Sequence, residues 1–329
     1  MKNIYDSKTI LVKFIIILSI FIQIGCNSEK KSNEVFISGD LIIFDKKPYN
    51  GLLVENYENG NTKFKCNIVE GLIQGSYIEF YENGKIKREG IYKNNLFFPK
   101  QIKTGNGLID IENKKYSTAI IGNQEWMTEN LSVSHFNNGD PIFYAKTDKE
   151  WAVSILEKRP AYCYVEDDEL DPNNYGKLYN YYAVIDSRGL APKNWKIPDK
   201  SEWDTLRDYT GNDLFSKLNS FLKNDFNGDI LKSSNGWYSN GYNLNGNNYT
   251  GFNAKPNGWV KFDEWQDLEK KYYKKDFSEQ NEISRWWINS NKTLYSSIVG
   301  YGGSYLNTNN EIIPLDFGLA VRCINKNKK

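Results

Sequence analysis

Histidine is almost missing from this sequence, since His135 is the only one among 329 residues. A metal site built on several histidines and a catalytic relay that needs two of them are therefore excluded. His135 is followed by the turn-rich residues 136–140, which favours an exposed loop position over a role as a general base. No cofactor is expected.

The sequence also lacks a charge excess of either sign, with 42 lysine and arginine residues against 41 aspartate and glutamate residues. Proteins that bind nucleic acid carry a basic face, because they must neutralise phosphate groups. No such face is evident along this chain. Nucleic acid is therefore not expected as a partner.

The apolar run near the N-terminus is too short to span a membrane, which takes about 20 residues. Three lysines precede this run, which covers residues 14–22, and the pair Gly25-Cys26 follows it. This order is typical of an export signal, so residues 1–26 are predicted to be a signal peptide. The polar residues 27–35 then form a predicted tether that lifts the protein off the membrane.

Gly25-Cys26 at the end of such a run resembles the signal of bacterial lipoproteins, although Gln23 replaces the usual aliphatic residue. The resemblance implies that Cys26 is lipidated and becomes the first residue of the mature chain. Several acyl chains, each contributing about 0.8 kcal/mol per buried methylene, would then anchor the protein to a membrane. The alternative is a secretory signal without lipidation. The predicted location is that of an exported outer-membrane or cell-surface lipoprotein.

Residues 36–100 contain a repeat with a period of 24 residues. Six residues of the first copy recur in the second: Gly51, Tyr57, Glu58, Asn59, Gly60 and Lys63 return as Gly75, Tyr81, Glu82, Asn83, Gly84 and Lys87. Apolar and polar residues alternate around each Asn-Gly pair, which predicts a β-hairpin with a type I′ turn. Because a single hairpin is marginally stable in water, an all-β repeat of stacked hairpins is expected.

The repeated residues resemble the MORN repeat, in the variant with Tyr-Glu-Asn-Gly that is common in bacterial chains. The resemblance implies a short, elongated antiparallel sheet that acts as a spacer or as a platform for protein interactions. The tyrosines either stack between neighbouring hairpins, which is the favoured interpretation, or form an exposed strip for a partner or a lipid head group.

Residues 107–326 differ in character and are rich in tryptophan, tyrosine, asparagine and glycine. Capping residues and apolar spacing predict helices that start at Thr147-Asp148, near Tyr175 and at Asp199, with a fourth at residues 214–222. The third is the clearest, because Asp199 and Glu202 are spaced as in a capping box. Strands are predicted beyond residue 228, including residues 249–254, 285–290 and 294–299.

Five motifs follow one another in this second region. They are Ile121 to Leu131, Tyr175 to Tyr179, Asn194 to Pro198, Gly251 to Gly258, and Val321 to Cys323. In this order they resemble the Fibrobacter succinogenes major paralogous domain, a module of bacterial surface and secreted proteins similar to the C-type lectin-like group. The resemblance implies an α+β fold with short helices and antiparallel strands, and a general role in binding.

The same resemblance bears on the cysteines. After Cys26, the chain contains Cys66, Cys163 and Cys323. Disulfides persist in exported proteins. Cys163 and Cys323 lie at places where the family often carries cysteine, so the resemblance implies a disulfide between them.

A calcium site, through which many C-type lectins hold sugars, has only weak candidates here. The pattern that starts at Asp225 fails, because Ile230 stands where the calcium loop needs a glycine. The other candidates lie on an acidic loop and are Asp167, Asp168 and Asp171. A solvated acidic loop is favoured there over weak calcium binding. The sugar-binding triplets Glu-Pro-Asn and Gln-Pro-Asp do not occur.

Two of the nine tryptophans, Trp259 and Trp265, lie in a polar stretch at residues 257–282 that is predicted to be an insertion. Exposed aromatic rings are suited to stacking on sugar rings or to anchoring a protein partner. Packing of the insertion against its own domain is the favoured alternative. Core positions are expected for Trp126, Trp195, Trp203 and either Trp286 or Trp287.

Together these features predict an envelope lipoprotein, held at a membrane by its lipid, that binds or adheres to a glycan or an envelope protein without catalysis. One alternative is an enzyme of the formylglycine-generating type, which shares the lectin-like fold and a proline-containing run ending in Glu-Trp. Those enzymes use a pair of cysteines near the end of the domain, and Cys323 has no nearby companion. The other alternative is a purely structural envelope protein.

Overall fold

The structure is a computed structural model that describes most of the chain after residue 28. The described residues are 29–39, 41–93, 96–100, 102–169, 171, 174–211, 228, 230–267, 270–291, 293–300, 306–308 and 312–327. The predicted signal peptide with Cys26 and the predicted helix at residues 214–222 lie outside them. Among the helices of the described residues, none is long and apolar enough to cross a membrane. The chain divides into two compact units, Met1–Phe97 and Phe98–Lys329.

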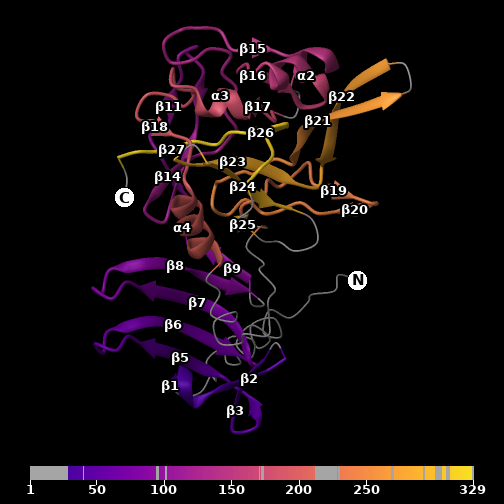
Figure 1. Ribbon diagram of the computed structural model, residues 1–329. Helices are drawn as coiled ribbons and strands as arrows, with labels where there is room; N and C mark the ends of the chain where they lie inside the picture. Colours follow the sequence, from indigo (N-terminus) through magenta and orange to yellow (C-terminus); the bar gives the residue numbers. More distant parts are fainter. Residues whose placement is uncertain are drawn as a thin grey trace, which may run out of the picture. The chain divides into compact units, whose positions relative to one another are not determined.

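Unit 1 is a β structure in its described part (Figure 1). Its elements are β1 (Glu29–Lys31), the 3-10 turn η1 (Ser32–Glu34), β2 (Phe36–Ser38), β3 (Leu41–Phe44), β4 (Lys47–Pro48), β5 (Gly51–Asn56), β6 (Thr62–Val69), β7 (Leu72–Phe80), β8 (Ile86–Lys93) and β9 (Leu96–Pro99). Six strands form one sheet in the order β1-β5-β6-β7-β8-β9, and β2, β3 and β4 form another. Strands β5 to β8 pair antiparallel, whereas β1 joins β5 in parallel.

The sequence repeat in unit 1 is also a repeat of structure. The hairpin β5–β6 carries the ion pair Glu55–Lys63, and the hairpin β7–β8 carries the equivalent pair Glu79–Lys87. The two hairpins are also joined directly, because the Tyr57 hydroxyl donates to the carbonyl of Phe80 at 2.7 Å. This contact agrees with the favoured place of the repeat tyrosines between neighbouring hairpins.

The turns of these hairpins differ from the predicted type I′ geometry. In Tyr57–Gly60 and Tyr81–Gly84 only the glycines have positive φ, at +87° and +79°. Each glycine N–H donates to the tyrosine carbonyl three residues earlier, at 2.9 and 2.8 Å. This pattern is a type I turn that ends in a left-handed glycine, as is common in three-residue hairpin loops. The prediction was wrong because the loop is longer than two residues, so asparagine need not adopt positive φ. A two-residue turn with positive φ at both positions occurs instead at Glu70-Gly71.

The predicted tether is largely folded. Residues 29–31 pair with Leu52–Val54 of β5. Residues 32–34 form η1, and the Lys31 N–H donates to the Glu34 carboxylate at 2.7 Å. Residues 29–34 of the expected tether 27–35 therefore belong to unit 1. The chain enters the large sheet at one terminal strand, β1, and leaves it from the other, β9.

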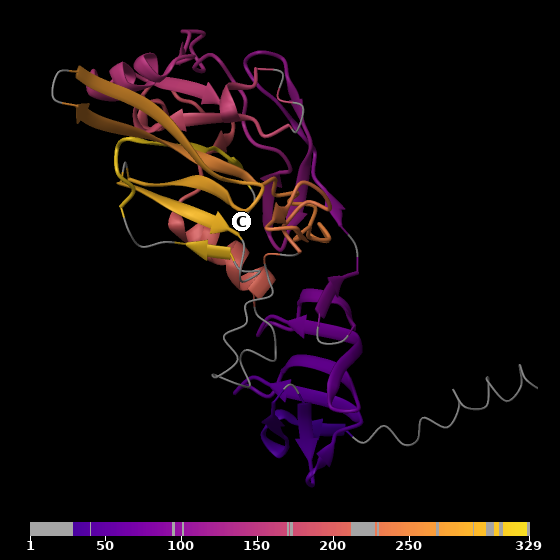
Figure 2. The same ribbon diagram turned by 90° about the vertical axis from the view of Figure 1, so that its right-hand side faces the viewer.

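The described part of unit 2 contains two larger sheets (Figures 1 and 2). One has the order β15-β16-β17-β26-β21-β23-β24-β25, with β22 paired to β21, and the other has the order β10-β13-β14-β27-β18. Their strands are β10 (Lys103–Thr104), β13 (Thr118–Ile121), β14 (Gln124–Met127), β15 (Phe143–Tyr144), β16 (Ala161–Tyr164), β17 (Lys177–Asn180), β18 (Trp195–Lys196), β21 (Asn257–Asp267), β22 (Lys270–Gln280), β23 (Ser284–Ser290), β24 (Thr293–Val299), β25 (Leu306–Thr308), β26 (Phe317–Ala320) and β27 (Ile324–Asn325). Two-stranded sheets are formed by β11 (Leu108–Ile109) with β12 (Lys115–Tyr116) and by β19 (Tyr238–Ser239) with β20 (Tyr242–Asn243).

Within the described residues, three short helices accompany these strands, namely α2 (Asp148–Leu156), α3 (Tyr181–Ile185) and α4 (Lys200–Gly211), together with the 3-10 turn η2 (Val165–Asp167). Strands make up 45% and helices 12% of the structure, which makes the fold a β-rich α+β. Both capping predictions are confirmed. The Thr147 hydroxyl accepts the Glu150 N–H at 3.2 Å. Asp199 and Glu202 each accept the other's N–H, at 3.1 and 3.0 Å.

The prediction of a helix that begins near Tyr175 is wrong for the first half of that segment. Residues 177–180 form β17, a strand with neighbours on both sides, and all four residues are buried. A central strand that is covered on both faces has no polar alternation, so its apolar residues can match helical spacing by chance. Only residues 181–185 are helical, capped by Asn180. The predicted strand at residues 249–254 is likewise a turn and loop, whereas 285–290 and 294–299 lie in β23 and β24.

The largest sheet separates two hydrophobic clusters. Trp286 belongs to one cluster and its neighbour Trp287 to the other, because successive side chains of a strand point to opposite faces. Leu178 and Tyr179 on β17 divide in the same way. The core of unit 2 therefore lies on both faces of this sheet.

The polar stretch predicted to be an insertion is the long hairpin β21–β22, which projects beyond the rest of the sheet (Figures 1 and 2). Its register sets residues of opposite charge directly across from one another, at Lys261 and Asp276, Asp263 and Lys274, and Asp267 and Lys270. Opposite charges at facing positions favour one register over its neighbours. The charge pattern of this stretch is therefore explained by strand pairing.

Candidate functional site

Four of the five motifs of unit 2 meet around one buried residue, Arg322. Its Nε and Nη2 donate to the Asn130 Oδ1 at 3.0 and 2.6 Å, and its Nη1 donates to the carbonyl of Phe252. The guanidinium lies 4.6 Å from the ring centre of Phe252 and 5.5 Å from that of Trp286. Residues from two other motifs, Asn130 and Phe252, therefore contact this side chain directly, together with Trp286 of β23.

Asn130 extends the same network to the Tyr175 motif. Its Oδ1 also accepts the indole N–H of Trp286 at 2.8 Å, and its Nδ2 donates to the carbonyl of Tyr175 at 2.7 Å. Burial lowers the pKa of Arg322 to about 9, because a charged group loses its hydration in the interior. Arg322 has no solvent exposure, so this network holds the scaffold together and is closed to a ligand.

The predicted core tryptophans are confirmed. All five are buried, namely Trp126, Trp195, Trp203, Trp286 and Trp287. The rings of Trp126 and Trp203 lie 4.8 Å apart, and those of Trp203 and Trp286 lie 5.5 Å apart and are stacked. Contacts of this kind contribute about 0.5–1.5 kcal/mol each beyond the burial of area. These aromatic residues of the motifs therefore belong to the core.

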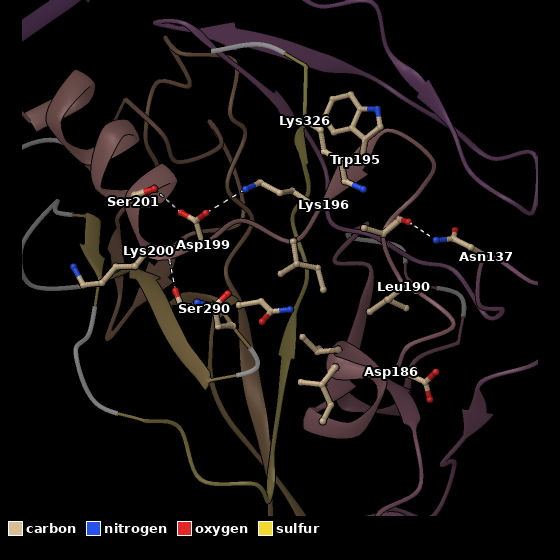
Figure 3. A pocket seen from close by; sticks show the side chains of 17 residues that line it. Asn137, Asp186, Leu190, Trp195, Lys196, Asp199, Lys200, Ser201, Ser290 and Lys326 are labelled. Atoms are coloured by element: carbon tan, nitrogen blue, oxygen red, sulfur yellow. Dashed lines mark hydrogen bonds and ion pairs between the residues drawn. The ribbon is translucent and has the colours of Figure 1, made fainter.

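A cleft of about 790 Å³ opens beside the third of the five motifs, the Asn194-to-Pro198 segment (Figure 3). Four parts of the chain supply its walls: Asn137, residues 184–201, the β23–β24 turn at residues 289–291, and Lys326. Its volume is within the range of about 300–1,000 Å³ typical of small-ligand sites. The cleft is the candidate functional site of unit 2.

One wall of the cleft is the start of α4 together with the β23–β24 turn. The Lys200 N–H donates to the Ser290 hydroxyl at 3.3 Å, and the Asn289 N–H donates to the carbonyl of Pro198 at 3.0 Å. The proline stops β18 from continuing and places Asp199 at the helix cap. These contacts fix the turn against the helix, so this wall is preformed.

The opposite wall is the loop after α3. The Asn137 side chain donates to the carbonyl of Ala191 at 2.7 Å, and its backbone N–H donates to the carbonyl of Gly189 at 3.0 Å (Figure 3). Gly189 has a φ of +82°, and a side chain there would meet the Asn137 amide at 2.8 Å. Glycine is therefore required where these two loops approach.

Most charges that line the cleft are already neutralised. The Lys196 ammonium lies 3.2 Å from Asp199 and 2.9 Å from Glu202, and Lys200 lies 2.8 Å from Asp204. A further lining residue, Asp186, is bound at 2.9 Å by Arg188, whose hydrogen bonds lower the pKa of that carboxyl. Lys326 is exposed and forms no ion pair with any residue that the structure describes. The cleft therefore offers amide and hydroxyl groups, apolar side chains and one available positive charge.

The sequence-based candidates Trp259 and Trp265 lie on β21, and neither is among the residues that line the cleft. Trp259 is half-buried: its ring stacks on Phe317 at 4.8 Å and its Nε1 donates to Glu279 at 2.6 Å. These contacts match the alternative in which the insertion packs against its own domain. The backbone of Trp265 pairs with Tyr272 farther out on the hairpin.

One of the calcium candidates on the acidic loop, Asp171, has a structural role. Asp171 accepts the N–H groups of Tyr175 and Gly176, at 2.6 and 2.9 Å, with its two carboxylate oxygens. Burial raises the pKa of Asp171. Asp167 ends η2 and Asp168 follows it. Within the described part of the chain, no three His, Cys, Asp or Glu side chains gather as a metal site would require.

The expected disulfide between Cys163 and Cys323 is not formed, and both residues are buried thiols. Cys163 lies on β16 opposite Leu178, and Leu178 lies opposite Ala320 on β26. Two strand spacings, about 10 Å, therefore separate Cys163 from Ala320. Cys323 follows Ala320 by three residues and belongs to the hydrophobic cluster on the other face. A disulfide needs side chains that point toward one another, whereas Cys163 and Cys323 belong to clusters on opposite faces of the sheet.

Lys177 is a buried cation that the sequence did not reveal. Only 3% of this residue is exposed, and its ammonium lies 4.2 Å from the ring centre of Tyr162 and donates to the Ser134 hydroxyl at 2.5 Å. Burial lowers the pKa of Lys177 to about 8. The Ser134 N–H donates to the Glu112 carboxylate, and the His135 Nδ1 lies 2.8 Å from the same carboxylate. The sequence pattern placed Lys177 in the helix predicted near Tyr175, and nothing in that pattern indicated that its side chain would be buried.

One protein-family model matches the region that contains the five motifs. The model of the Fibrobacter succinogenes major domain matches residues 120–325, which is more than half of the chain. The match includes every lining residue of the cleft except Lys326. No curated protein and no solved structure matches the chain. On the strength of this match, the chain belongs to the Fibrobacter succinogenes major domain family.

Proposed function

We propose that this protein is an exported lipoprotein of the bacterial envelope whose second unit binds a glycan, without catalysis, in the cleft beside the Asn194-to-Pro198 segment. The cleft carries this proposal. Polar groups from several loops converge there on a space of ligand size. The lipid anchor is supported by the order of lysines, apolar run and Gly25-Cys26 in the sequence.

The lining of the cleft suits a sugar that carries one anionic group. Four of its five charged side chains are already engaged in ion pairs. Neutral amides and hydroxyls come from Asn137, Asn289, Asn291, Ser201 and Ser290. Such groups pair with sugar hydroxyls, and the apolar side chains Ile185, Leu190 and Ile197 suit the C–H faces of a sugar ring. Lys326 supplies the available charge for a carboxylate or a sulfate on the ligand.

Binding in this cleft is expected to be independent of calcium. The two carboxylates that line it, Asp186 and Asp199, are already engaged by Arg188 and Lys196. Calcium takes six to eight oxygen ligands, of which carboxylates are the strongest. Glycan binding in this cleft would therefore differ from the calcium-dependent mode of many C-type lectins.

The fold and role proposed for each unit follow the sequence resemblances. Unit 2 is proposed to be C-type lectin-like, on the basis of its motif series, and unit 1 to be a MORN-type spacer. The spacer role is supported by the path of the chain, which enters the sheet at β1 and leaves it from β9. Five strand spacings of about 4.8 Å separate these strands, or about 24 Å in all.

A non-catalytic role is supported by the state of Cys323. Burial raises the pKa of its thiol, so the nucleophilic thiolate is disfavoured. An enzyme of the formylglycine-generating type acts through cysteines and would need that reactivity. Catalysis by Ser134 with Lys177 would need an N–H group to stabilise an oxyanion. The backbone N–H of Ser134 is already used, because it donates to the Glu112 carboxylate.

Binding to an array of neutral and acidic glycans, with and without a chelator, tests the proposal. Wild-type protein should retain an acidic glycan when calcium is removed. Lys326→Glu should weaken this binding at least tenfold, and Asn291→Gly, which keeps the positive φ of +53° at that turn, should weaken it several-fold. Lys149→Glu on the exposed start of α2 is the matched charge control and should bind as wild type.

Two outcomes would contradict the cleft as the site. One is equal binding by wild type and Lys326→Glu with a glycan ligand in hand. The other is loss of binding on Trp259→Ala or Trp265→Ala with the cleft variants unaffected, which would move the site to the hairpin β21–β22. If the protein retained no glycan but bound a purified envelope protein, its ligand would be a protein and not a glycan.

A further inference from the structure

We infer that the β1 edge of unit 1 and the adjoining β3–β4 turn lie directly on the membrane surface that holds the lipid anchor, with lipid head groups as their partner. This inference rests on the proposed lipidation of Cys26. It reverses the expectation of a tether that lifts the protein away from the bilayer. The observation behind it is the short length of chain between Cys26 and the first folded residue.

Only Asn27 and Ser28 separate Cys26 from Glu29, the first residue of β1. Three Cα-to-Cα steps of 3.8 Å reach at most about 11 Å. The head-group layer on each side of a bilayer is itself about 5–7 Å thick. Glu29 must therefore lie at or just above the head groups when the acyl chains of Cys26 are inserted.

Strand β1 is held firmly in its unit, so the limit on Glu29 applies to its neighbours as well. Its three residues pair with residues 52–54 of β5. The Lys30 ammonium lies 4.2 Å from the ring centre of Phe44, at the end of β3. This contact places the β3–β4 turn at Asp45-Lys46 beside β1, on the same side of the unit as the anchor.

The residues at this end of unit 1 suit a lipid surface. Phe36 is 53% exposed and pairs with Ile43 across β2 and β3, beside the same turn. Lys46 and Lys47 are exposed. A lysine stem can lie along the apolar layer while its ammonium meets lipid phosphates, and exposed aromatic rings favour the interface.

The anchor, and not charge, is what holds this surface to the membrane. The four lysines at this end, Lys30, Lys31, Lys46 and Lys47, are offset by Glu29, Glu34 and Asp45. A nearly neutral surface gains little from the negative potential of a bilayer, since each net positive charge contributes only about 1 kcal/mol. Contact should therefore depend on the length of the linker and respond weakly to salt.

The test uses the full-length lipidated protein in vesicles that contain phosphatidylglycerol and phosphatidylethanolamine, with a nitroxide on a fraction of the head groups. A fluorophore is attached at Lys47→Cys or, as the matched control, at Lys85→Cys, which lies after the β7–β8 turn. The three native cysteines of the described chain are buried, so the introduced thiol is the accessible one. At least three strand spacings, about 14 Å, separate the control strand from β1.

Quenching at Lys47→Cys should exceed that at Lys85→Cys at least twofold and should persist in 1 M salt. Insertion of twenty Gly-Ser residues between Ser28 and Glu29 adds a chain with a mean span of about 25 Å. This insertion should reduce quenching at Lys47→Cys to the level of the control. Cys26→Ala should abolish both fatty-acid labelling and vesicle binding.

The possible failures separate the anchor from the contact. If wild type incorporates fatty acid at Cys26 but the two positions are quenched equally, the membrane contact is overturned and the anchor stands. If quenching at Lys47→Cys survives the Gly-Ser insertion, the linker does not set the contact and the inference is overturned. If wild type incorporates no fatty acid, both the anchor and the contact are refuted.

Discussion

In unit 1 each hairpin binds the next hairpin along the chain, whereas the central contact of unit 2 joins Asn130 to Arg322 across 192 positions. The turn, the ion pair and the register shift of one hairpin in unit 1 return 24 residues later in the next. In unit 2, by contrast, Asn130 gathers bonds from three distant segments. One unit is stabilised by local repetition and the other by a single network.

This difference indicates how each unit can serve a binding protein. A repeat tolerates change because each hairpin depends on its neighbours alone. A network closed by one buried cation holds several loops in one arrangement at once, and loops held in this way can carry a preformed site. The cleft is found in unit 2, where its walls come from four separate parts of the chain.

The largest effect is expected on removal of the network's centre, by Arg322→Ala. Asn130 and the carbonyl of Phe252 would lose the donors that Arg322 supplies, and Asn130 would keep only the indole N–H of Trp286 on its Oδ1. Loss of one member of a buried charged network destabilises by about 3–5 kcal/mol. Unfolding in denaturant, followed by tryptophan fluorescence, measures this change in the free energy of unfolding.

Arg207→Ala is the surface control for this experiment. Arg207 is 39% exposed, pairs with Asp204 and donates to the Thr308 hydroxyl at 2.8 Å, so its loss should change the free energy of unfolding by about 1 kcal/mol, well below the loss at Arg322. A loss below about 1 kcal/mol for Arg322→Ala would show that unit 2 does not depend on this network. The contrast between the two units would then be wrong.

A second effect concerns pH and Lys177. Burial holds the pKa of Lys177 at about 8, against an unfolded value of 10.5. Between these values the unfolded chain binds more protons than the folded chain, so stability rises with pH from about 8 towards 10.5. From pH 7 to pH 9 this group should add about 1 kcal/mol to the free energy of unfolding.

Lys177→Met should remove that rise and keep unit 2 folded, since replacing a buried charge by an apolar side chain is often neutral or stabilising. The difference between wild type and Lys177→Met, measured in denaturant at pH 7, 8 and 9, cancels the other titrating groups. The nearby charges of Glu112, Lys114 and Asp110 act on this pKa as well. Parallel pH profiles for the two proteins would contradict the burial of a charged lysine.

The sequence predicts best what neighbouring residues determine. The capping box of Asp199 and Glu202 lies within four residues, and the structure contains it. The repeat of unit 1 was evident for the same reason. The turn type was missed because the number of loop residues depends on where strand pairing stops, at the register shift after Glu55.

What the sequence left out depends on distant partners. Arg322 was seen only as part of a motif, and its acceptors on Phe252 and Asn130 lie 70 and 192 residues away. The disulfide was inferred for Cys163 and Cys323 without knowledge that they lie on opposite faces of a sheet. The cleft joins four separate segments, of which only the Asn194-to-Pro198 segment was singled out in advance.

The smallest effects are expected in the repeat, on Gly60→Ala and Gly84→Ala. Both glycines have positive φ, and an added Cβ would meet nothing within 4 Å at either site. The loss should therefore be that of the left-handed backbone alone, about 1 kcal/mol, and equal in the two variants. Gly60→Asn should lose less, because asparagine tolerates this conformation. Hydrogen exchange of the turn amides measures each loss locally, and unequal values for the two glycines would show that the hairpins are not equivalent.

The same exchange measurements test how far the effect of each glycine substitution reaches. The Tyr57 hydroxyl donates to the carbonyl of Phe80 in the next hairpin, so changes in protection should be confined to one hairpin and its neighbour. Changes that spread farther would mean that unit 1, too, depends on a long-range network.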